Sequence, residues 1–385
     1  MSTKTRRIAI NVGSGYVPGM NAVVKGVALA AAEQGWDVVG IRDGFAGLLH
    51  PEDYPDGGLV TLSPQVAEGL DPSASSVLGQ SPSDDPFHMR HIDEDGMMVE
   101  VDRSDDLVHA LNQNSISALI SLVGMEGLSI LYKLHRKGIN TICIPRSIEN
   151  DIASTSVSLG FNSAMSFTID MLDRAREAAR SSRQIGVVEV QGARAGWLAL
   201  QAGTAAGADV ILIPEIPFDL DAIAEHFSKK ISAARPYGLV VVAEGIDLSG
   251  IESDDTEPSS MHKSLSPLAI GEATGFAIQH SGRAAKSIAN CLQLKLAEKA
   301  HPLVIGAWAR GGAPTAVDRQ LGLAYGGAAI RALKAEQDGV MVAFRPPDIV
   351  FVPLIEAINK FRTVSTDSEM ALIARTLGIC LGDNL

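Results

Sequence analysis

One short segment of the chain concentrates side chains that could do chemistry. Residues Pro145–Asp151 read Pro-Arg-Ser-Ile-Glu-Asn-Asp and directly follow an apolar run. They place a cation (Arg146), a hydroxyl (Ser147) and two carboxylates (Glu149 and Asp151) close together in the chain. Ligands of open α/β sheets bind outside the carboxyl ends of the strands, so a strand that ends in this set is typical of a ligand-binding turn.

Glu149 and Arg146 suggest two different tasks within this segment. Glu149 could act as a general base, and Arg146 could compensate the negative charge of a phosphate. The alternative is a polar turn between a strand and a helix that takes no part in chemistry. Taken alone, the segment is explained more simply by this alternative.

Three further segments follow expected strands and resemble ligand-binding turns. In Gly13–Asn21, small residues would let backbone amides approach a phosphate at the start of the next helix. In Val123–Leu128, Glu126 stands between two glycines and suits a magnesium ion near phosphates. In Arg310–Arg319, two glycines after Arg310 permit a sharp turn that would point this arginine into a cleft. The structural alternatives are a tight turn, a solvated carboxylate and an ordinary helix entry, respectively.

The composition describes a soluble globular protein that is long enough for two α/β domains. The chain has 385 residues, of which 46% are hydrophobic and 20% are charged. Its longest apolar runs are only as long as a strand, so we expect no membrane span. The net charge of −13 argues against nucleic acid as a partner, although a local basic pocket could still bind phosphate.

The three cysteines indicate neither a metal site nor a disulfide framework. Cys143, Cys291 and Cys380 are far apart and odd in number. A reducing cytoplasm is therefore the expected compartment. The first residues lead straight into a strand, with no separate apolar region and cleavage site, so we do not expect secretion.

Strand-like and helix-like runs alternate along the chain, which predicts a parallel α/β architecture. The expected strands are 7–12, 37–42, 118–123, 141–144, 186–190, 209–214, 239–243 and 302–307. The expected helices are 20–34, 128–137, 163–182, 220–235, 276–298 and 316–334. Two polar stretches interrupt the alternation: 51–85, expected to form an extended surface excursion, and 247–267, expected to form a mobile loop.

Together the four segments resemble the phosphofructokinase family. The stretch 310–319, Arg-Gly-Gly-Ala-Pro-Thr-Ala-Val-Asp-Arg, is similar to the family's Arg-Gly-Gly-Ser-Pro-Thr-Ala-Phe-Asp-Arg. The stretch 145–151 is similar to its Pro-Lys-Thr-Ile-Asp-Asn-Asp loop. Pro18-Gly-Met-Asn matches the family's first turn, and Gly124-Met-Glu-Gly stands in the place of Gly-Gly-Asp-Gly. Residues 189–198, Glu-Val-Gln-Gly-Ala-Arg-Ala-Gly-Trp-Leu, resemble Glu-Val-Met-Gly-Arg-His-Ala-Gly-Phe-Leu, and the matches keep the family order over most of the chain.

This resemblance implies a fold, a reaction and an assembly. The fold is α/β, with two Rossmann-like domains that have mainly parallel sheets. Residues 1–160 plus 309–352 would bind the phosphoryl donor, and 161–308 plus 353–385 would bind the sugar phosphate. Members transfer the terminal phosphoryl group of ATP or pyrophosphate to the 1-hydroxyl of fructose 6-phosphate, with Mg²⁺. They are usually homodimers or homotetramers.

The resemblance also implies roles for individual residues. Glu149 takes the place of the catalytic aspartate base, with Ser147, Asp151 and the basic Arg146 beside it. Glu126 takes the place of the metal-site aspartate. The donor site would contain Gly15, Tyr16 and Gly127. The residues expected at the sugar-phosphate site are Gln191, Gly192, Glu244, Arg310, Gln184 and His301, the last two in the places of arginines from a neighbouring subunit.

Several contacts of the family pattern are substituted. Tyr16 replaces an aspartate of the family pattern, Pro82 and Ala193 replace arginines, and Ala307 replaces a histidine. The replacement of the family's aspartate by Glu149 lengthens the side chain by one methylene, which would shift the carboxylate. About 1 Å of misplacement can cost on the order of a hundredfold in rate. These changes leave two alternatives open: a kinase for a different sugar phosphate or polyol, and a non-catalytic protein that binds a metabolite or a partner subunit.

The expected donor follows from two positions. Gly127 would leave room for a nucleotide, as in members that use ATP. A basic residue such as Arg146 is common in pyrophosphate users but also occurs in some ATP users. The resemblance therefore favours ATP slightly over pyrophosphate.

Overall fold

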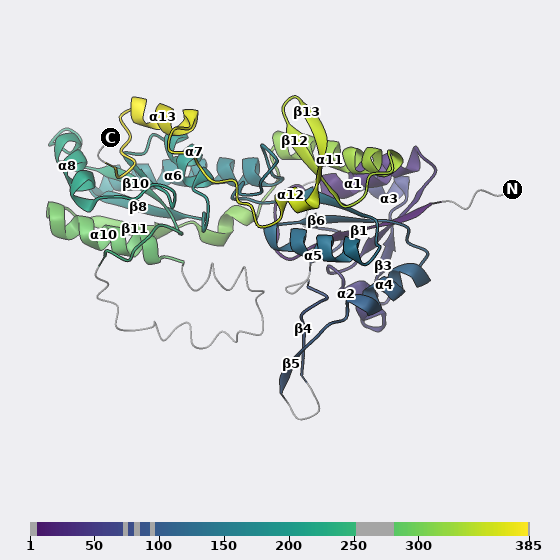
Figure 1. Cartoon of the computed structure of the whole chain (residues 1–385). Coiled ribbons are helices and arrows are strands. Elements are labelled where there is room, and N and C mark those ends of the chain that lie inside the picture. Colours follow the sequence, from purple (N-terminus) through teal and green to yellow (C-terminus); the bar gives the residue numbers. More distant parts are fainter. Residues whose placement is uncertain (1–5, 72–75, 81–84, 93–96, 252–280, 384–385) are drawn as a thin grey trace. The chain divides into compact units, whose positions relative to one another are not determined.

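The structure is a computed structural model of the chain, and it describes residues 6–71, 76–80, 85–92, 97–251 and 281–383 (Figure 1). The chain forms two compact units, each with its own sheet. Unit 1 comprises Met1–Ser147, Ile152–Asn162 and Gly312–Lys360. Unit 2 comprises Ile148–Asp151, Ser163–Gly311 and Phe361–Leu385.

Apart from shifts of two residues at 161–162 and three residues at 309–311, these limits differ in two places from the ranges that the sequence suggests. Residues 148–151 belong to unit 2, and 353–360 belong to unit 1. The second difference has a packing cause: Leu354 and Ala357 are fully buried in the hydrophobic core of unit 1. The binding roles assigned to the two ranges stay predictions.

The sheet of unit 1 is mainly parallel, as expected. Its strand order is β13-β12-β7-β6-β1-β2-β3, and only the two outermost strands are antiparallel to their neighbours. The strands are β1 (Arg7–Val12), β2 (Asp37–Ile41), β3 (Leu59–Thr61), β6 (Leu119–Val123), β7 (Thr141–Pro145), β12 (Val340–Arg345) and β13 (Asp348–Pro353). Strands β6 and β7 are buried along their whole length, as parallel strands covered on both faces are.

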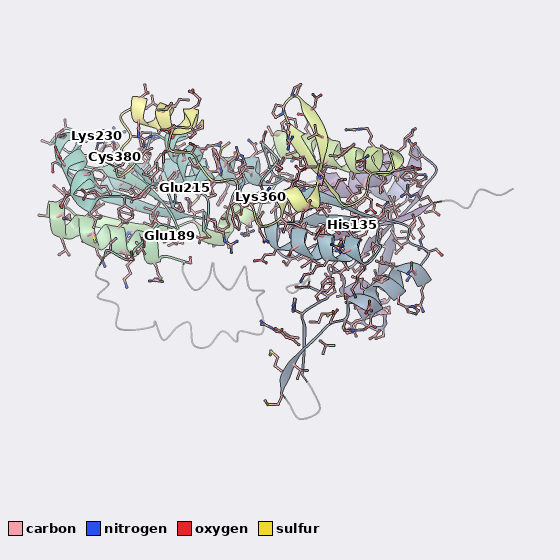
Figure 2. The ribbon with its side chains drawn as sticks, in the orientation of Figure 1. His135, Glu189, Glu215, Lys230, Lys360 and Cys380 are labelled. Carbon is pink, nitrogen blue, oxygen red and sulfur yellow. The ribbon has the colours of Figure 1, made fainter. Side chains whose placement is uncertain are left out.

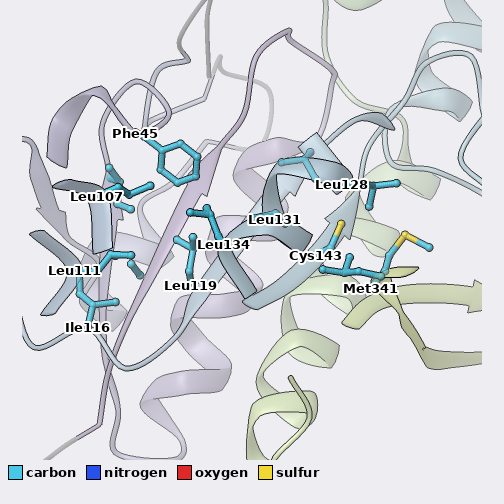
Figure 3. Close-up of a cluster of buried hydrophobic side chains, with 14 of the residues drawn as sticks. Phe45, Leu107, Leu111, Ile116, Leu119, Leu128, Leu131, Leu134, Cys143 and Met341 are labelled. Carbon is cyan, nitrogen blue, oxygen red and sulfur yellow. The ribbon is translucent and has the colours of Figure 1, made fainter. Parts of the chain in front are cut away.

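Helices supply the cover of this sheet. They are α1 (Met20–Ala32), α2 (Ala46–Leu49), α3 (Pro64–Glu68), α4 (Ser104–Gln113), α5 (Met125–Arg136), α11 (Ala316–Lys334) and α12 (Leu354–Ala357). Figure 3 shows the core cluster in which Leu128, Leu131 and Leu134 of α5 pack near Leu119 and Cys143 of the sheet. A short 3₁₀ helix, η1 (Pro51–Asp53), and a separate hairpin of β4 (Met89–Ile92) and β5 (Met98–Val101) complete unit 1.

The sheet of unit 2 is parallel throughout its described strands, with the order β11-β8-β10-β9. The strands are β8 (Ile185–Val190), β9 (Val210–Leu212), β10 (Gly238–Ala243) and β11 (Ala300–Val304). The helices are α6 (Phe161–Ser182, which begins in unit 1), α7 (Trp197–Ala205), α8 (Leu220–Lys230), α10 (Arg283–Leu296) and α13 (Glu369–Thr376), with the 3₁₀ helix η4 (Gly306–Arg310). The C-terminal segment borders the sheet, because the backbone of Cys380 hydrogen-bonds Asp209 and Ile211.

Several element limits differ from the sequence prediction. The expected strand 302–307 stops at Val304, because η4 begins at Gly306. The expected helix 220–235 stops at Lys230, and Arg235 instead turns back to bind Asp209. The stretch 51–85 was expected to be an extended surface excursion. Its described residues instead contain the regular elements η1, β3 and α3.

Some predictions fall outside the described residues. These are the first part of the expected helix 276–298, most of the polar stretch 247–267, and Pro82. Within the described ranges, no helix is long and apolar enough to cross a membrane.

Candidate functional site

Polar residues follow the carboxyl ends of the two central strands of unit 2. Gln191 and Gly192 come directly after β8, and Glu244 comes directly after β10. Glu149 joins them from the segment 148–151, because the backbone N–H of Ala193 donates a hydrogen bond of 3.1 Å to its carboxylate. Four of the residues expected in the site therefore meet at one end of this sheet.

Glu149 is a largely buried carboxyl group with a raised pKa. Its pKa is raised to about 7, mainly by burial and in part by the neighbouring charge of Asp151. The guanidinium of Arg310, 3.9 Å from the carboxylate, acts in the opposite direction. A carboxyl group with this pKa is suited to accept a proton near neutral pH.

Glu244 shares this environment. Its pKa is also raised to about 7, mainly by burial and in part by the charges of Glu149 and Glu189. The backbone of Gly192 hydrogen-bonds its carboxylate and partly offsets the increase. The two carboxyls therefore titrate in the same pH range and oppose each other's ionisation.

Glu189, which is labelled in Figure 2, has a structural role. It is 1% exposed, and its carboxylate accepts hydrogen bonds from the backbone N–H groups of Gly282 and Ala285. These amides lie at the start of α10, where helices leave N–H groups without a partner inside the helix. Glu189 therefore caps α10 and fixes it against β8.

A cavity of about 330 Å³ opens beside Glu244. The described residues that line it are Ala193, Glu244, Gly245, Ile246, Asp247, Leu248, Ser249 and Arg283. The volume is within the range of small-molecule sites. Its position at the carboxyl ends of parallel strands is the one in which α/β sheets bind ligands.

A larger cavity of about 470 Å³ lies at the opposite end of the same sheet. There the carboxylate of Asp209, 2% exposed, accepts hydrogen bonds from Arg235 at 2.8 and 3.0 Å and from Lys230 at 3.4 Å. Because both cations bind this one buried carboxylate, we interpret the cluster as structural.

The expected donor-site residues lie in unit 1, at the carboxyl ends of β1 and β6. Gly15 has a φ of +85°, which favours glycine, and belongs to the turn before α1. Tyr16 is half-buried, and burial raises its pKa. Glu126 is exposed in the first turn of α5. The described residues contain no group of three or more His, Cys, Asp or Glu side chains that could hold a metal ion, so Glu126 would supply a single carboxylate.

Gly127 is explained by packing. A Cβ atom at this position would lie 2.4 Å from the Cβ of Val123. The first turn of α5 thus needs a glycine to lie on β6. The role of this glycine in leaving room for a nucleotide stays a prediction.

Arg146 is also more enclosed than the sequence suggested. It is 4% exposed, and its guanidinium donates hydrogen bonds to the carbonyls of Leu122, at 3.2 Å, and of Ser14. It therefore fixes the glycine-rich turn after β1 to the end of β6. Ser147, the last residue of this part of unit 1, donates its backbone N–H to Leu159.

Gln184 and His301 are not near the carboxylates of unit 2. Gln184 precedes β8, and His301 pairs with Gly186 near the start of that strand. Both lie at the amino-terminal end of the sheet. The structure of one chain does not bring them to Glu149 or Glu244.

Sequence reasoning missed residues that lie far from the motifs. Arg283 and Asp247 line the cavity beside Glu244. Arg362 holds the segment 148–151, since its backbone N–H donates to the carbonyl of Asp151 at 2.8 Å. No motif marks these positions. The position of Arg283 at the start of a helix is the only local signal, because cations are unfavourable there.

The glycine-rich motif 310–319 divides into two parts. Arg310 faces Glu149, as described above, whereas Asp318 is fully buried and accepts a 2.9 Å hydrogen bond from the N–H of Gly160. Thr315 caps α11 through the N–H of Asp318. Only the first residue of the motif therefore reaches the carboxylate cluster.

The chain thus has two α/β units. A carboxyl group of raised pKa and an arginine lie at the end of one sheet, and a glycine-rich turn lies at the end of the other. This arrangement is typical of α/β proteins that bind ligands at the carboxyl ends of their strands. Comparison with known proteins gives the family. The family model described as Phosphofructokinase matches residues 7–333, and the chain belongs to the phosphofructokinase family.

Individual relatives and solved structures agree. The chain is 36% identical to an ATP-dependent 6-phosphofructokinase of Chloroflexus aurantiacus over 385 residues, which covers 100% of both chains. It is 31% identical to ATP-dependent 6-phosphofructokinase 3 of Bacteroides thetaiotaomicron, covering 98% of this chain and 100% of that one. The crystal structure of a pyrophosphate-dependent phosphofructokinase from Marinobacter aquaeolei has a similar fold, with a TM-score of 0.71 at 20% identity, over 98% of this chain and 88% of that one.

Proposed function

We propose that this chain is a 6-phosphofructokinase, which transfers the terminal phosphoryl group of ATP to the 1-hydroxyl of fructose 6-phosphate. The observation that carries the proposal is Glu149, a largely buried carboxyl with a pKa of about 7 beside Arg310. The names of the two relatives support this activity over a different acceptor or a non-catalytic role.

Glu149 is proposed as the base that accepts the proton of the sugar 1-hydroxyl. Its hydrogen bond from Ala193 and its contact with Arg310 hold the carboxylate in one orientation. Glu244, Gln191 and Gly192 are proposed to bind the sugar. Catalysis of phosphoryl transfer consists largely of positioning and charge stabilisation, so these contacts would carry most of the rate.

The donor is proposed to bind at unit 1, near Gly15, Tyr16 and the N-terminal amides of α1. Arg146 would act there indirectly, by fixing the turn that contains Ser14. ATP is supported by the names of the relatives, since Gly127 is explained by packing against Val123. Mg²⁺ fits Glu126, because magnesium is usually held by one or two carboxylates together with waters and substrate phosphates, and it neutralises phosphate charge.

Further parts of the proposal concern the assembly and the compartment. Gln184 and His301 would serve a sugar-phosphate site only in a neighbouring copy of the chain, which is consistent with a homodimer or homotetramer. The net charge of −13 is consistent with small-molecule substrates in place of nucleic acid. A cytoplasmic location stays a prediction.

The test is an assay of Mg²⁺-dependent phosphorylation of fructose 6-phosphate, with ATP and pyrophosphate as alternative donors. Glu149→Gln should reduce kcat by roughly a hundredfold to ten-thousandfold, because it removes the general base. Glu149→Asp keeps a carboxylate and should retain part of the activity. Glu225→Gln, an exposed carboxylate on α8, is the control and should not change kcat.

Two results would contradict the proposal. One is a wild-type protein that phosphorylates fructose 6-phosphate with neither donor. The other is a Glu149→Gln variant with the kcat of the wild type.

A further inference from the structure

We propose that Arg194 binds the phosphoryl group while this group passes from ATP to the 1-hydroxyl of the sugar. The similar family segment has a histidine at this position, so the role is particular to this chain. The inference rests on the proposed function and deepens it, because it names a residue that acts on the transferred group itself.

The proposed reaction places the transferred group close to Glu149. The 1-oxygen of the sugar forms a bond to the terminal phosphorus of ATP, the bond from that phosphorus to its bridging oxygen breaks, and ADP leaves. The proton of the 1-hydroxyl goes to Glu149, which must lie within hydrogen-bonding distance of the 1-oxygen. Because the phosphorus is bonded to this oxygen, a cation that stabilises the transferred group must also lie beside Glu149.

The first observation is that Arg194 lies beside the proposed base. It directly follows Ala193, whose backbone N–H donates a hydrogen bond of 3.1 Å to the carboxylate of Glu149. Burial raises the pKa of Glu149, and the positive charge of Arg194 is one of the influences that oppose this rise. The guanidinium is therefore close enough to act on charge at the carboxylate, and on the charge of a phosphoryl group next to it.

The second observation is that an aromatic ring orients Arg194. Its guanidinium lies 4.5 Å from the ring centre of Phe361. The next residue, Arg362, donates hydrogen bonds to the carbonyl of Asn150 at 3.3 Å and to the carbonyl of Asp151 at 2.8 Å. Phe361 is thus tied to the segment that carries the proposed base, and its ring holds the guanidinium beside that segment.

The third observation is that a stacked and exposed guanidinium can bind an anion. Stacking on an aromatic ring engages the flat face of the guanidinium, whereas hydrogen bonds to phosphate come from the N–H groups at its edge. Arg194 is exposed, so a ligand can reach this edge. Arg310, by contrast, faces the carboxylate of Glu149 at 3.9 Å and helps to hold the base. Oriented donors such as Arg194 stabilise the charge of a transferred phosphoryl group.

The test uses two ligands that differ only in the transferred group. Fructose 6-phosphate is the proposed acceptor, and fructose 1,6-bisphosphate is the product with the additional phosphate on its 1-oxygen. Isothermal titration calorimetry gives both dissociation constants without a donor. Arg194→Gln should weaken binding of the bisphosphate by roughly tenfold to a hundredfold, the effect of losing a charged hydrogen bond. Its affinity for fructose 6-phosphate should stay within about twofold of the wild type, because that ligand lacks the 1-phosphate and distant charges are screened.

Two further variants separate a specific contact from a general charge effect. Arg174→Gln removes the same charge from an exposed position on α6, where Arg174 pairs with Asp170 at 3.0 Å. It should leave both dissociation constants within about twofold of the wild type. Arg194→Lys keeps the charge but loses the planar fork, so it should recover part of the affinity for the bisphosphate.

Turnover and melting temperature separate catalysis from folding. With ATP, Arg194→Gln should lower kcat by roughly a hundredfold with little change in the KM for fructose 6-phosphate, because the contact forms with the transferred group. Its melting temperature should stay within about two degrees of the wild type, since stacking at an exposed site contributes little to stability.

Three results would overturn the assignment. Equal losses for the two sugar phosphates would place Arg194 at the 6-phosphate or in a structural role. An unchanged affinity for the bisphosphate would exclude contact with the 1-phosphate. A loss that Arg174→Gln reproduces would show a general effect of charge.

The outcomes also distinguish this inference from the proposed reaction. If the wild type phosphorylates fructose 6-phosphate and Arg194→Gln binds the bisphosphate as the wild type does, only the role of Arg194 fails. If Arg194→Gln loses affinity for the bisphosphate alone but neither donor supports turnover of the wild type, only the kinase proposal fails. A wild type that binds neither sugar phosphate would overturn both.

Discussion

At the scale of single residues, the decisive feature is a carboxyl group whose pKa its surroundings control. Burial and the charge of Asp151 raise the pKa of Glu149 to about 7, and Arg310 opposes them. A base must be ionised to accept a proton. The proposed activity should therefore fall as the pH drops through this pKa.

Asp151→Asn tests this control. The variant removes a neighbouring negative charge, so the pKa of Glu149 should fall and the acid limb of the kcat profile should move to lower pH. The measurement is kcat from pH 5.5 to 9 at saturating substrate. Asp170→Asn, which removes an exposed carboxylate of α6, should leave the limb in place. An acid limb that stays put or moves to higher pH in Asp151→Asn would contradict the assignment of Glu149 as the base.

At the scale of elements, the C-terminal segment holds the segment that carries Glu149. Arg362 donates its backbone N–H to the carbonyl of Asp151 at 2.8 Å and its guanidinium to the carbonyl of Asn150 at 3.3 Å. The same guanidinium stacks 4.0 Å from the ring centre of Trp197, whose indole N–H donates to the carbonyl of Arg362 at 2.7 Å. Two elements distant in sequence thus set the backbone next to the proposed base.

Removing this clamp should reduce catalysis more than substrate binding. Arg362→Leu loses both the stacking and the bond to Asn150, so Glu149 should lose part of its orientation. Because about 1 Å of misplacement can cost on the order of a hundredfold, we expect kcat to fall roughly tenfold to a hundredfold with a smaller change in KM. Lys360→Leu makes the same charge change two residues earlier, and it should keep the wild-type kcat. Equal kcat values for the two variants would show that Arg362 does not position the loop.

The sequence predicts some buried elements at their observed limits but misses others, among them the apolar strand β12. The strand Arg7–Val12 and the helix Ala316–Lys334 have the predicted limits. Helix α7 was not predicted, because Trp197–Leu200 is buried on all sides and shows no amphipathic period. The antiparallel β13 escaped prediction because it is an edge strand whose side chains are mostly half-exposed.

Only the site residues that lie within recognisable motifs could be predicted from the sequence. Glu149 and Arg310 follow from local segments, and the structure places them together. The contacts of Arg146 and Gly127 depend on residues from other turns of the fold, so their structural tasks could not be read from the motifs. The position of Arg283 beside Glu244 could not be predicted, because no sequence spacing links the two residues. Only the folded sheet brings them together.

At the scale of the whole molecule, the carboxylate cluster costs stability. The pKa values of Glu149 and Glu244 are about 7 in the folded protein, above the ordinary value of 4.5 for a glutamate in the unfolded chain. Between these values the folded chain binds more protons than the unfolded chain. The free energy of unfolding therefore has a contribution that is fully present below pH 4.5 and is lost as the pH rises through 7.

Glutamine at both positions should remove this dependence, because it resembles the protonated carboxyl at every pH. The double variant Glu149→Gln and Glu244→Gln should melt on the order of a few degrees above the wild type at pH 8.5, with a smaller difference at pH 6. Glu225→Gln should show little change at either pH, because its carboxylate is exposed. The measurement is the melting temperature of each protein at both pH values. A double variant that is less stable at pH 8.5, or that gains equally at pH 6, would show that the buried carboxylates do not set the pH dependence of stability.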